Sequence, residues 1–156
     1  MEIKFEAEEL KFNVRSSCII KDKNHKQVLL SDMRGIKSHK AYILPGGRLD
    51  IMENSKEAII REIEEELGIK TNPVLISVEE IIERTTNFHM MEFVYYAEID
   101  DFNKIKTLDD GWDKFEIVKL DEIDKYDIRP KPIKELIKLG QYNGIGHHIN
   151  YDWGEE

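Results

Sequence analysis

The stretch GGRLDIMENSKEAIIREIEEELGI, residues 46–69, constrains the fold and function of this chain more than any other. It opens with paired glycines, which permit sharp turns and let a neighbouring backbone or a ligand approach closely. Asn54 then suits a helix N-cap with Glu57 three residues later, and Gly68 stands where a C-terminal cap is expected. The stretch therefore predicts a glycine turn that leads directly into a helix over residues 55–67.

The predicted helix has an apolar stripe and a separate acidic face. The stripe is expected to face the core and consists of Ile60, Ile63 and Leu67. The acidic face consists of Glu62, Glu65 and Glu66. Arg61 precedes Glu65 by four residues, which allows an ion pair. A solvated acidic surface is the ordinary interpretation, but these charges repel one another and oppose the helix dipole, so a bound divalent cation explains the helix pattern equally well. The glycine turn ahead of the helix then favours a metal–phosphate site.

The spacing of these residues resembles the Nudix box. Gly47, five residues, Glu53, seven residues and then Arg61 to Ile69 match G-x5-E-x7-R-E-U-x-E-E-x-G-U, where U is a bulky aliphatic residue. Every specified position agrees, so residues 47–69 carry the complete box. The resemblance implies an α/β protein, a Nudix-type α/β/α sandwich with a mixed β-sheet between helices. It also implies a hydrolase that cleaves a diphosphate linkage with a divalent metal and water.

By the same resemblance, the box residues receive catalytic and metal-binding roles. Mg²⁺, with Mn²⁺ as an alternative, would be held by Glu62, Glu65, Glu66, Glu53 and the main-chain carbonyl of Gly46. Arg61 resembles the structural arginine of the family, which holds a glutamate in position by a salt bridge. The general base stays open between a box glutamate and three carboxylates before the 115–120 strand: Asp110, Asp113 and Glu116.

Other polar and aromatic residues are weaker candidates. Substrate phosphate is predicted to contact Arg34, Lys37, Lys40 and Arg48, although a solvated basic loop, which also contains His39, explains the first three equally well. His89 is expected to be an edge or core residue, and neighbouring His147 and His148 would point to opposite faces of a strand. Four aromatic side chains are candidates for stacking on a base: Tyr42, Phe88, Tyr95 and Trp112.

The rest of the chain predicts one α/β domain. A hairpin is expected from residues 14–20 and 27–33, and further strands at 41–44, 74–82, 90–99 and 115–120. Pro132 and Gly140 delimit a second amphipathic helix, so two helices are expected to cover a mixed sheet on both faces. The predicted domain spans residues 1–140, and residues 141–156 are predicted to be a C-terminal tail.

Composition restricts the partners. The net charge of −9 disfavours general nucleic-acid binding and anionic membranes but does not forbid a small anionic ligand. The resemblance to the Nudix family implies that this ligand is a small nucleotide, and a homodimer is allowed. The single cysteine and the lack of an apolar span or signal pattern predict a cytoplasmic location. The predicted function is Mg²⁺-dependent hydrolysis of a nucleoside diphosphate derivative such as ADP-ribose, a nucleotide sugar or a dinucleotide. The alternatives are a nucleoside triphosphate pyrophosphatase that cleans the nucleotide pool, and a non-catalytic nucleotide-binding sensor.

Overall fold

The computed structural model describes residues 11–33, 39–105 and 114–151. Within these ranges eight strands form one sheet in the order β3-β2-β1-β6-β5-β8, with β4 paired to β1 and β7 paired to β2. The β1–β6 and β5–β8 pairs are parallel and the others are antiparallel, so the sheet is mixed. The strands are β1 (Lys11–Asp22), β2 (Gln27–Met33), β3 (Ala41–Ile43), β4 (Gly46–Arg48), β5 (Val74–Glu83), β6 (Phe88–Ile99), β7 (Phe115–Lys119) and β8 (Gly146–Tyr151).

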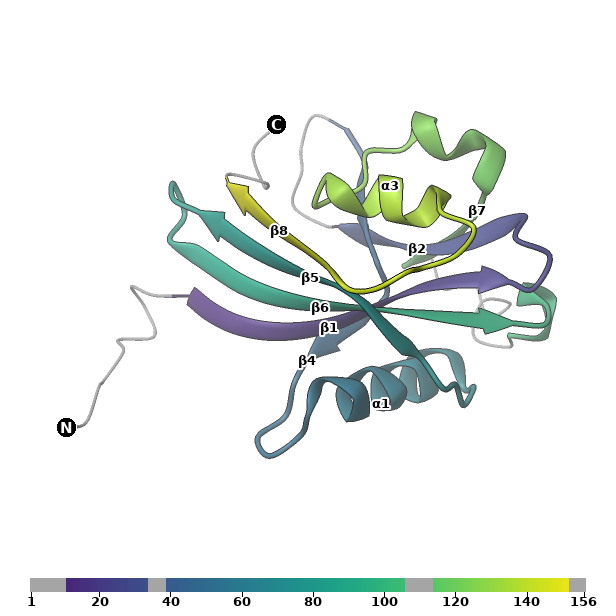
Figure 1. Cartoon of the computed structure of the whole chain (residues 1–156), viewed down its shortest axis with the longest axis horizontal. Coiled ribbons are helices and arrows are strands. Elements are labelled where there is room, and N and C mark those ends of the chain that lie inside the picture. Colours follow the sequence, from purple (N-terminus) through teal and green to yellow (C-terminus); the bar gives the residue numbers. More distant parts are fainter. Residues whose placement is uncertain (1–10, 34–38, 106–113, 152–156) are drawn as a thin grey trace.

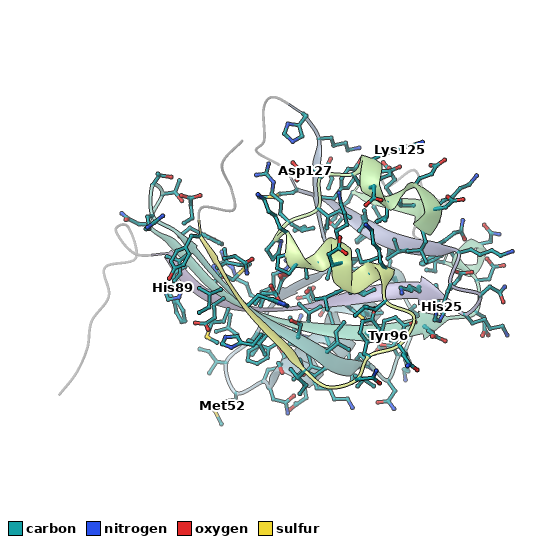
Figure 2. The ribbon with its side chains drawn as sticks, turned by 45° about the horizontal axis from the view of Figure 1, so that its top comes forward. His25, Met52, His89, Tyr96, Lys125 and Asp127 are labelled. Atoms are coloured by element: carbon teal, nitrogen blue, oxygen red, sulfur yellow. The ribbon has the colours of Figure 1, made fainter. Side chains whose placement is uncertain are left out.

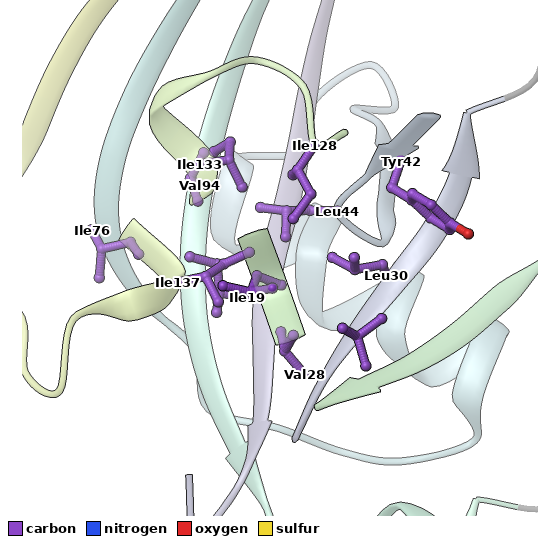
Figure 3. Packing of buried hydrophobic residues seen from close by; sticks show 12 residues of the cluster. Ile19, Val28, Leu30, Tyr42, Leu44, Ile76, Val94, Ile128, Ile133 and Ile137 are labelled. Carbon is purple, nitrogen blue, oxygen red and sulfur yellow. The ribbon is translucent and has the colours of Figure 1, made fainter. Parts of the chain in front are cut away.

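Two helices cover opposite faces of the sheet, α1 (Ser55–Leu67) and α3 (Pro132–Lys138) (Figure 1). Alternate residues of β1 pack against α1 and against α3, because successive side chains of a strand point to opposite faces of the sheet. Ile20 packs with Ile59 and Ile63 of α1. Ile19 packs with Ile133 and Ile137 of α3, as Figure 3 shows. The predicted α/β/α sandwich is therefore confirmed.

Two short 3-10 helices, η1 (Phe102–Lys104) and η2 (Leu120–Lys125), complete the two layers. Phe102 of η1 is buried on the α1 side, and Ile123 of η2 is buried on the α3 side. Among the described residues, no helix has both the length and the apolar character needed to cross a membrane.

The local predictions for α1 are confirmed at both ends. Asn54 Oδ1 accepts a hydrogen bond from the backbone N–H of Glu57 at 2.8 Å, and Gly68 adopts a left-handed conformation with φ of 71°. The predicted apolar stripe was wrong at one position, since Ile59 is buried and Ile60 is only partly buried. Residues 59, 63 and 67 are spaced by four, which brings Ile59 rather than Ile60 onto the inner face.

Two strands were not predicted. The first is β4, which starts at the glycine pair, where short and flexible residues suggested only a turn. The second is β8, which lies in the segment predicted as a tail and pairs in parallel with β5. Its composition gave no strand signal because the partly buried positions are Gly146, His148 and Asn150, whereas the apolar Ile149 and Tyr151 are exposed. The division into a domain at 1–140 and a tail at 141–156 stays a prediction.

Candidate active site

The glycine pair brings β4, β1 and α1 into close contact. Gly46 and Gly47 pair with Ser17 and Ser16 of β1. A Cβ atom on Gly46 would lie 2.1 Å from the backbone oxygen of Ser16, and one on Gly47 would lie 2.3 Å from Glu62 Oε1. Each glycine therefore leaves space that a side chain would fill, and Gly47 allows the Glu62 carboxylate to lie directly against β4.

Arg61 is the centre of an ion-pair network on the exposed side of α1. Its Nε donates to Glu53 Oε2 at 2.7 Å and its Nη2 donates to Glu53 Oε1 at 2.9 Å, which is a two-point contact. Its Nη1 donates to Glu62 Oε1 at 2.9 Å, and more weakly to Glu65 Oε2 at 3.3 Å. The pair predicted with Glu65 exists, but the hydrogen bonds to Glu53 are shorter. These bonds and the backbone N–H of Asp50 lower the pKa of Glu53 to about 2.

Glu66 lies apart from that network and pairs with Lys114. Glu66 Oε1 is 3.0 Å from Lys114 Nζ, and the Glu66 side chain is only 14% exposed. Burial raises the pKa of Glu66 above its ordinary value, although Lys114 opposes that shift. Sequence reasoning missed Lys114, because only the packing of the start of β7 near α1 reveals this contact.

The acidic face fits an oxygen-preferring divalent cation by its chemistry. It offers only carboxylates, which Mg²⁺ and Mn²⁺ favour, and the buried Glu66 gains from a nearby positive charge. Among the described residues, however, the carboxylates do not form a group of three or more metal-ligating side chains. Arg61 lies among Glu53, Glu62 and Glu65, and Lys114 pairs with Glu66, so two cations of the protein itself offset part of the charge of these four carboxylates.

A cavity of about 570 Å³ adjoins this acidic face. Lys114 connects the two, since it lines the cavity and also binds Glu66. Arg48 lines the cavity as well, and its backbone oxygen accepts a hydrogen bond from Arg61 at 3.1 Å. The full lining combines charged with apolar side chains: Asn13, Arg15, Asp32, Met33, Ile43, Arg48, Phe88, Met90, Glu92 and Lys114. Its volume falls in the range of small-molecule sites.

Of the predicted phosphate contacts, only Arg48 lines this cavity within the described residues. Lys40 Nζ instead lies 3.8 Å from Glu116 Oε1 and 4.0 Å from Asp32 Oδ2. Glu116 also accepts a hydrogen bond from Tyr42 Oη at 3.1 Å, and the Tyr42 ring packs in the cluster under α3. Glu116 is thus on the sheet face opposite α1, the face that Arg15 and Glu92 of the cavity share with Ile19 and Val94, and its role as general base stays a prediction. Five other candidates lie outside the described residues: Arg34, Lys37, Asp110, Trp112 and Asp113.

Among the aromatic candidates with described positions, Phe88 alone lines the cavity. Tyr42 and Tyr95 are core residues, and Tyr95 Oη lies 2.6 Å from Ser55 Oγ at the start of α1. His89 is exposed and packs edge-on against Phe12 at 4.9 Å.

The remaining histidines pair with carboxylates outside α1, and these histidines are His25, His39, His147 and His148. Figure 2 shows His89 at one end of the sheet, with His25 and Tyr96 at the other. His147 pairs with Glu80 at 2.5 Å, and His148 pairs with Glu79 at 2.6 Å. Since Glu79 and Glu80 are adjacent in β5, the two histidines point to opposite sheet faces, as predicted.

Partly buried Arg15 and buried Glu92 are charged cavity residues that the sequence did not suggest. Arg15 Nε donates to Glu92 Oε1 at 3.3 Å, and Arg15 Nη2 donates to the backbone oxygen of Leu44 at 2.5 Å. The available signal was a charged residue inside an otherwise apolar strand, since buried charges are uncommon unless they are paired.

The chain matches the family model described as NUDIX domain over residues 11–138. A search of curated protein sequences finds no significant match. Among solved structures, the chain is similar to a NUDIX hydrolase from Nitrosomonas europaea, with 22% identity, a TM-score of 0.62, and coverage of 82% of this chain and 87% of that one. It is also similar to a mutator MutT protein from Bacillus halodurans, with 24% identity, a TM-score of 0.64, and coverage of 90% and 92%. A third similar structure is NrtR from Shewanella oneidensis in complex with a 27mer DNA, with 13% identity, a TM-score of 0.63, and coverage of 80% and 58%.

Proposed function

The chain belongs to the NUDIX domain family, and from that premise we propose that it hydrolyses the diphosphate linkage of a nucleoside diphosphate derivative with Mg²⁺. It is a Nudix hydrolase, and its substrate and metal are what we propose. One observation carries it: the carboxylates of α1 adjoin a cavity of about 570 Å³ that also presents Arg15, Arg48 and Lys114. Cations beside carboxylates suit a phosphate that is bound partly by the protein and partly through a metal.

The two halves of the cavity suit the two halves of such a substrate. Arg48 and Lys114 lie toward α1, where they can bind the diphosphate oxygens. Phe88 and Met90 are neighbours on one face of β6 and give an apolar surface for the base. In this binding mode the diphosphate would lie beside the acidic face and the nucleoside would lie away from it.

The acidic residues would hold the metal through Glu62, Glu65, Glu66, Glu53 and the carbonyl of Gly46. When bound, a divalent cation neutralises phosphate charge and lowers the pKa of a coordinated water. Phosphoryl transfer requires mainly positioning and charge neutralisation, so a protein nucleophile is unnecessary. Arg61 orients Glu53 and Glu62 through its hydrogen bonds to both, and its hydrogen bonds to Glu53 lower the pKa of that carboxyl. Lys114 contacts Glu66 through Oε1, and exchange of this contact for a metal would free the Lys114 ammonium for phosphate.

Product analysis over a nucleotide panel with Mg²⁺ tests the proposal. The panel contains ADP-ribose, nucleotide sugars, dinucleoside polyphosphates and nucleoside triphosphates. We expect hydrolysis of a diphosphate derivative, reduced about 100-fold or more in Glu65→Gln, the loss expected when a metal site is damaged. Glu64→Gln is the matched control, because Glu64 is an exposed glutamate of the same helix at an unspecified position of the box.

Three results would contradict the proposal. Hydrolysis of triphosphates alone would favour the pool-cleaning pyrophosphatase. Binding without hydrolysis of any compound would favour the sensor. Equal activity of Glu65→Gln and the wild type would show that Glu65 does not serve the reaction.

A further inference from the structure

The side-chain amide of Asn13 is a polar group of the cavity that forms no hydrogen bond with any described residue. Asn13 belongs to β1, is partly buried and lines the cavity. Neither its amide nitrogen nor its amide oxygen is among the buried polar atoms that lack a partner, so both atoms are exposed to solvent. A molecule in the cavity can therefore reach this amide.

The neighbours of Asn13 place it at the apolar end of the cavity. β1 and β6 lie side by side (Figure 1), and Asn13 is opposite Met90 of β6. Phe88 precedes Met90 by two residues on the same face, at roughly 7 Å along the strand. The amide is thus beside the apolar surface that the proposed function assigns to the base.

The cations of the cavity lie toward its other end. Arg15 follows Asn13 by two residues on the same face of β1, and Arg15 is opposite Arg48 of β4. Lys114 pairs with Glu66 of α1. A substrate whose diphosphate contacts Arg48 and Lys114 would therefore extend past Arg15 toward Asn13.

The amide can contact a base at two points. A carboxamide carries two N–H donors and one carbonyl acceptor, which match an adjacent acceptor and donor on the edge of a base. Asparagine usually binds adenine in this way, through the amino group and a ring nitrogen, whereas guanine is usually bound by arginine or lysine. The neighbouring cation Arg15 already donates to Glu92 and to the Leu44 carbonyl, so the group suited to read the base is the amide.

We propose that Asn13 is a specificity-determining residue whose amide binds the edge of the base through two hydrogen bonds, with adenine preferred. This inference rests on the proposed function, since it assigns the nucleoside end of the same cavity, and it makes the substrate class an adenosine diphosphate derivative. A base that cannot pair with the amide is rejected because it leaves the amide without partners in the complex.

Calorimetric binding of the monophosphates of adenosine, guanosine, cytidine and uridine in metal-free buffer tests this inference. The wild type should bind adenosine monophosphate most tightly. Asn13→Ala should bind it about 10- to 100-fold more weakly, the effect of losing a two-point contact to a base, and should bind all four with similar affinity. Asn24→Ala should match the wild type. It is the control, because Asn24 is an exposed asparagine in the turn between β1 and β2, outside the cavity.

A second variant should exchange the preference instead of removing it. Asn13→Asp replaces the amide donors with a second acceptor, which matches the two adjacent N–H donors of guanine and opposes the ring nitrogen of adenine. This variant should bind guanosine monophosphate about tenfold more tightly than adenosine monophosphate. Asn24→Asp controls for the added negative charge and should keep the wild-type preference.

A third arm compares adenosine monophosphate with purine riboside monophosphate, which lacks the amino group of the base. The wild type should bind this analogue about 2- to 10-fold more weakly, the effect of losing one hydrogen bond. In Asn13→Ala the two compounds should bind equally. A difference that disappears together with the amide reports direct contact between the amide and the amino group, which a loss of stability alone would not produce.

Unchanged affinity for adenosine monophosphate in Asn13→Ala would overturn the inference. So would an equal loss for all four monophosphates, since the amide would then not distinguish the bases, and so would an analogue effect that persists in Asn13→Ala. A wild type that prefers another base would overturn the assignment of adenine. Hydrolysis of the nucleotide panel by the wild type is a separate measurement that uses neither variant, so failure of this inference and failure of the proposed function remain distinguishable.

Discussion

Replacing Gly46 or Gly47 with alanine should separate stability from activity at two adjacent positions. At Gly46 the new Cβ would lie 2.1 Å from the Ser16 backbone oxygen and 2.7 Å from the Ser17 Cα. At Gly47 the three nearest atoms would all belong to the Glu62 carboxyl group, the closest at 2.3 Å. Backbone atoms of a central strand cannot move without breaking strand pairs, whereas a glutamate side chain can change rotamer.

The magnitudes follow from these contacts. Relief of the Gly46 clash requires β4 to move away from β1 by about 1 Å or more, with an overpacking cost of about 1–3 kcal/mol. Each weakened β1–β4 hydrogen bond adds about 1 kcal/mol to this destabilisation. Alanine also restricts the unfolded chain more than glycine does, which offsets about 0.4–1 kcal/mol of the loss. A net loss of about 3 kcal/mol lowers the melting temperature of a chain this long by roughly 6–12 °C. Gly47→Ala should stay within about 1 kcal/mol of the wild type, because only the Glu62 carboxylate moves.

Thermal melting by circular dichroism and Mg²⁺-dependent turnover at 25 °C measure the two effects. We expect Gly46→Ala to melt early, and Gly47→Ala to melt near the wild type while losing at least about tenfold in turnover, since Glu62 is displaced. Gly140→Ala is a control, because a Cβ there has no neighbouring atom within 4 Å. An unchanged melting temperature in Gly46→Ala would refute the steric reasoning, as would full activity in Gly47→Ala.

Four further predictions concern the charges and the last strand. Arg61→Ala should lower both the melting temperature and the turnover, because Glu53, Glu62 and Glu65 lose their shared cation. Arg61→Lys should recover only part of each loss, since an ammonium group cannot make the two-point contact of a guanidinium. Glu66→Gln should abolish turnover yet have a melting temperature no lower than that of the wild type at pH 7. Burial raises the pKa of Glu66 and so disfavours its charged form, and a lower melting temperature in the variant would refute this reasoning. The pKa of Glu53 falls from 4.5 to about 2 on folding, so its contribution to stability is complete above pH 4.5 and is lost as the pH falls toward 2; melting curves of Glu53→Gln should lack that acid-dependent loss. Removal of residues after 140 should lower the melting temperature by several degrees, since Glu79 loses His148 and Asn150; unchanged melting would show that β8 adds no stability.

The candidate site was most predictable where its geometry is local. The helix over 55–67, its caps and its acidic face follow from spacing along one element, and the structure reproduces them because a helix fixes which side chains share a face. The choice between Ile59 and Ile60 was the exception, since it depends on how α1 rotates against the sheet. The family resemblance likewise rested on residues 47–69, which are contiguous.

The cavity depended on the tertiary structure, because its lining comes from β1, β2, β3, β4, β6 and Lys114, the residue before β7. Lys114 reaches Glu66 across 48 positions of sequence, and Arg15 reaches Glu92 across 77. A single sequence contains no signal for such pairs beyond a charge in an apolar strand. Strand β8 likewise depended on the tertiary structure. Its own composition does not predict a strand, and it forms one by pairing with β5. The sequence by itself thus determined the acidic helix and its chemistry, and the packing of distant strands decided what that helix faces.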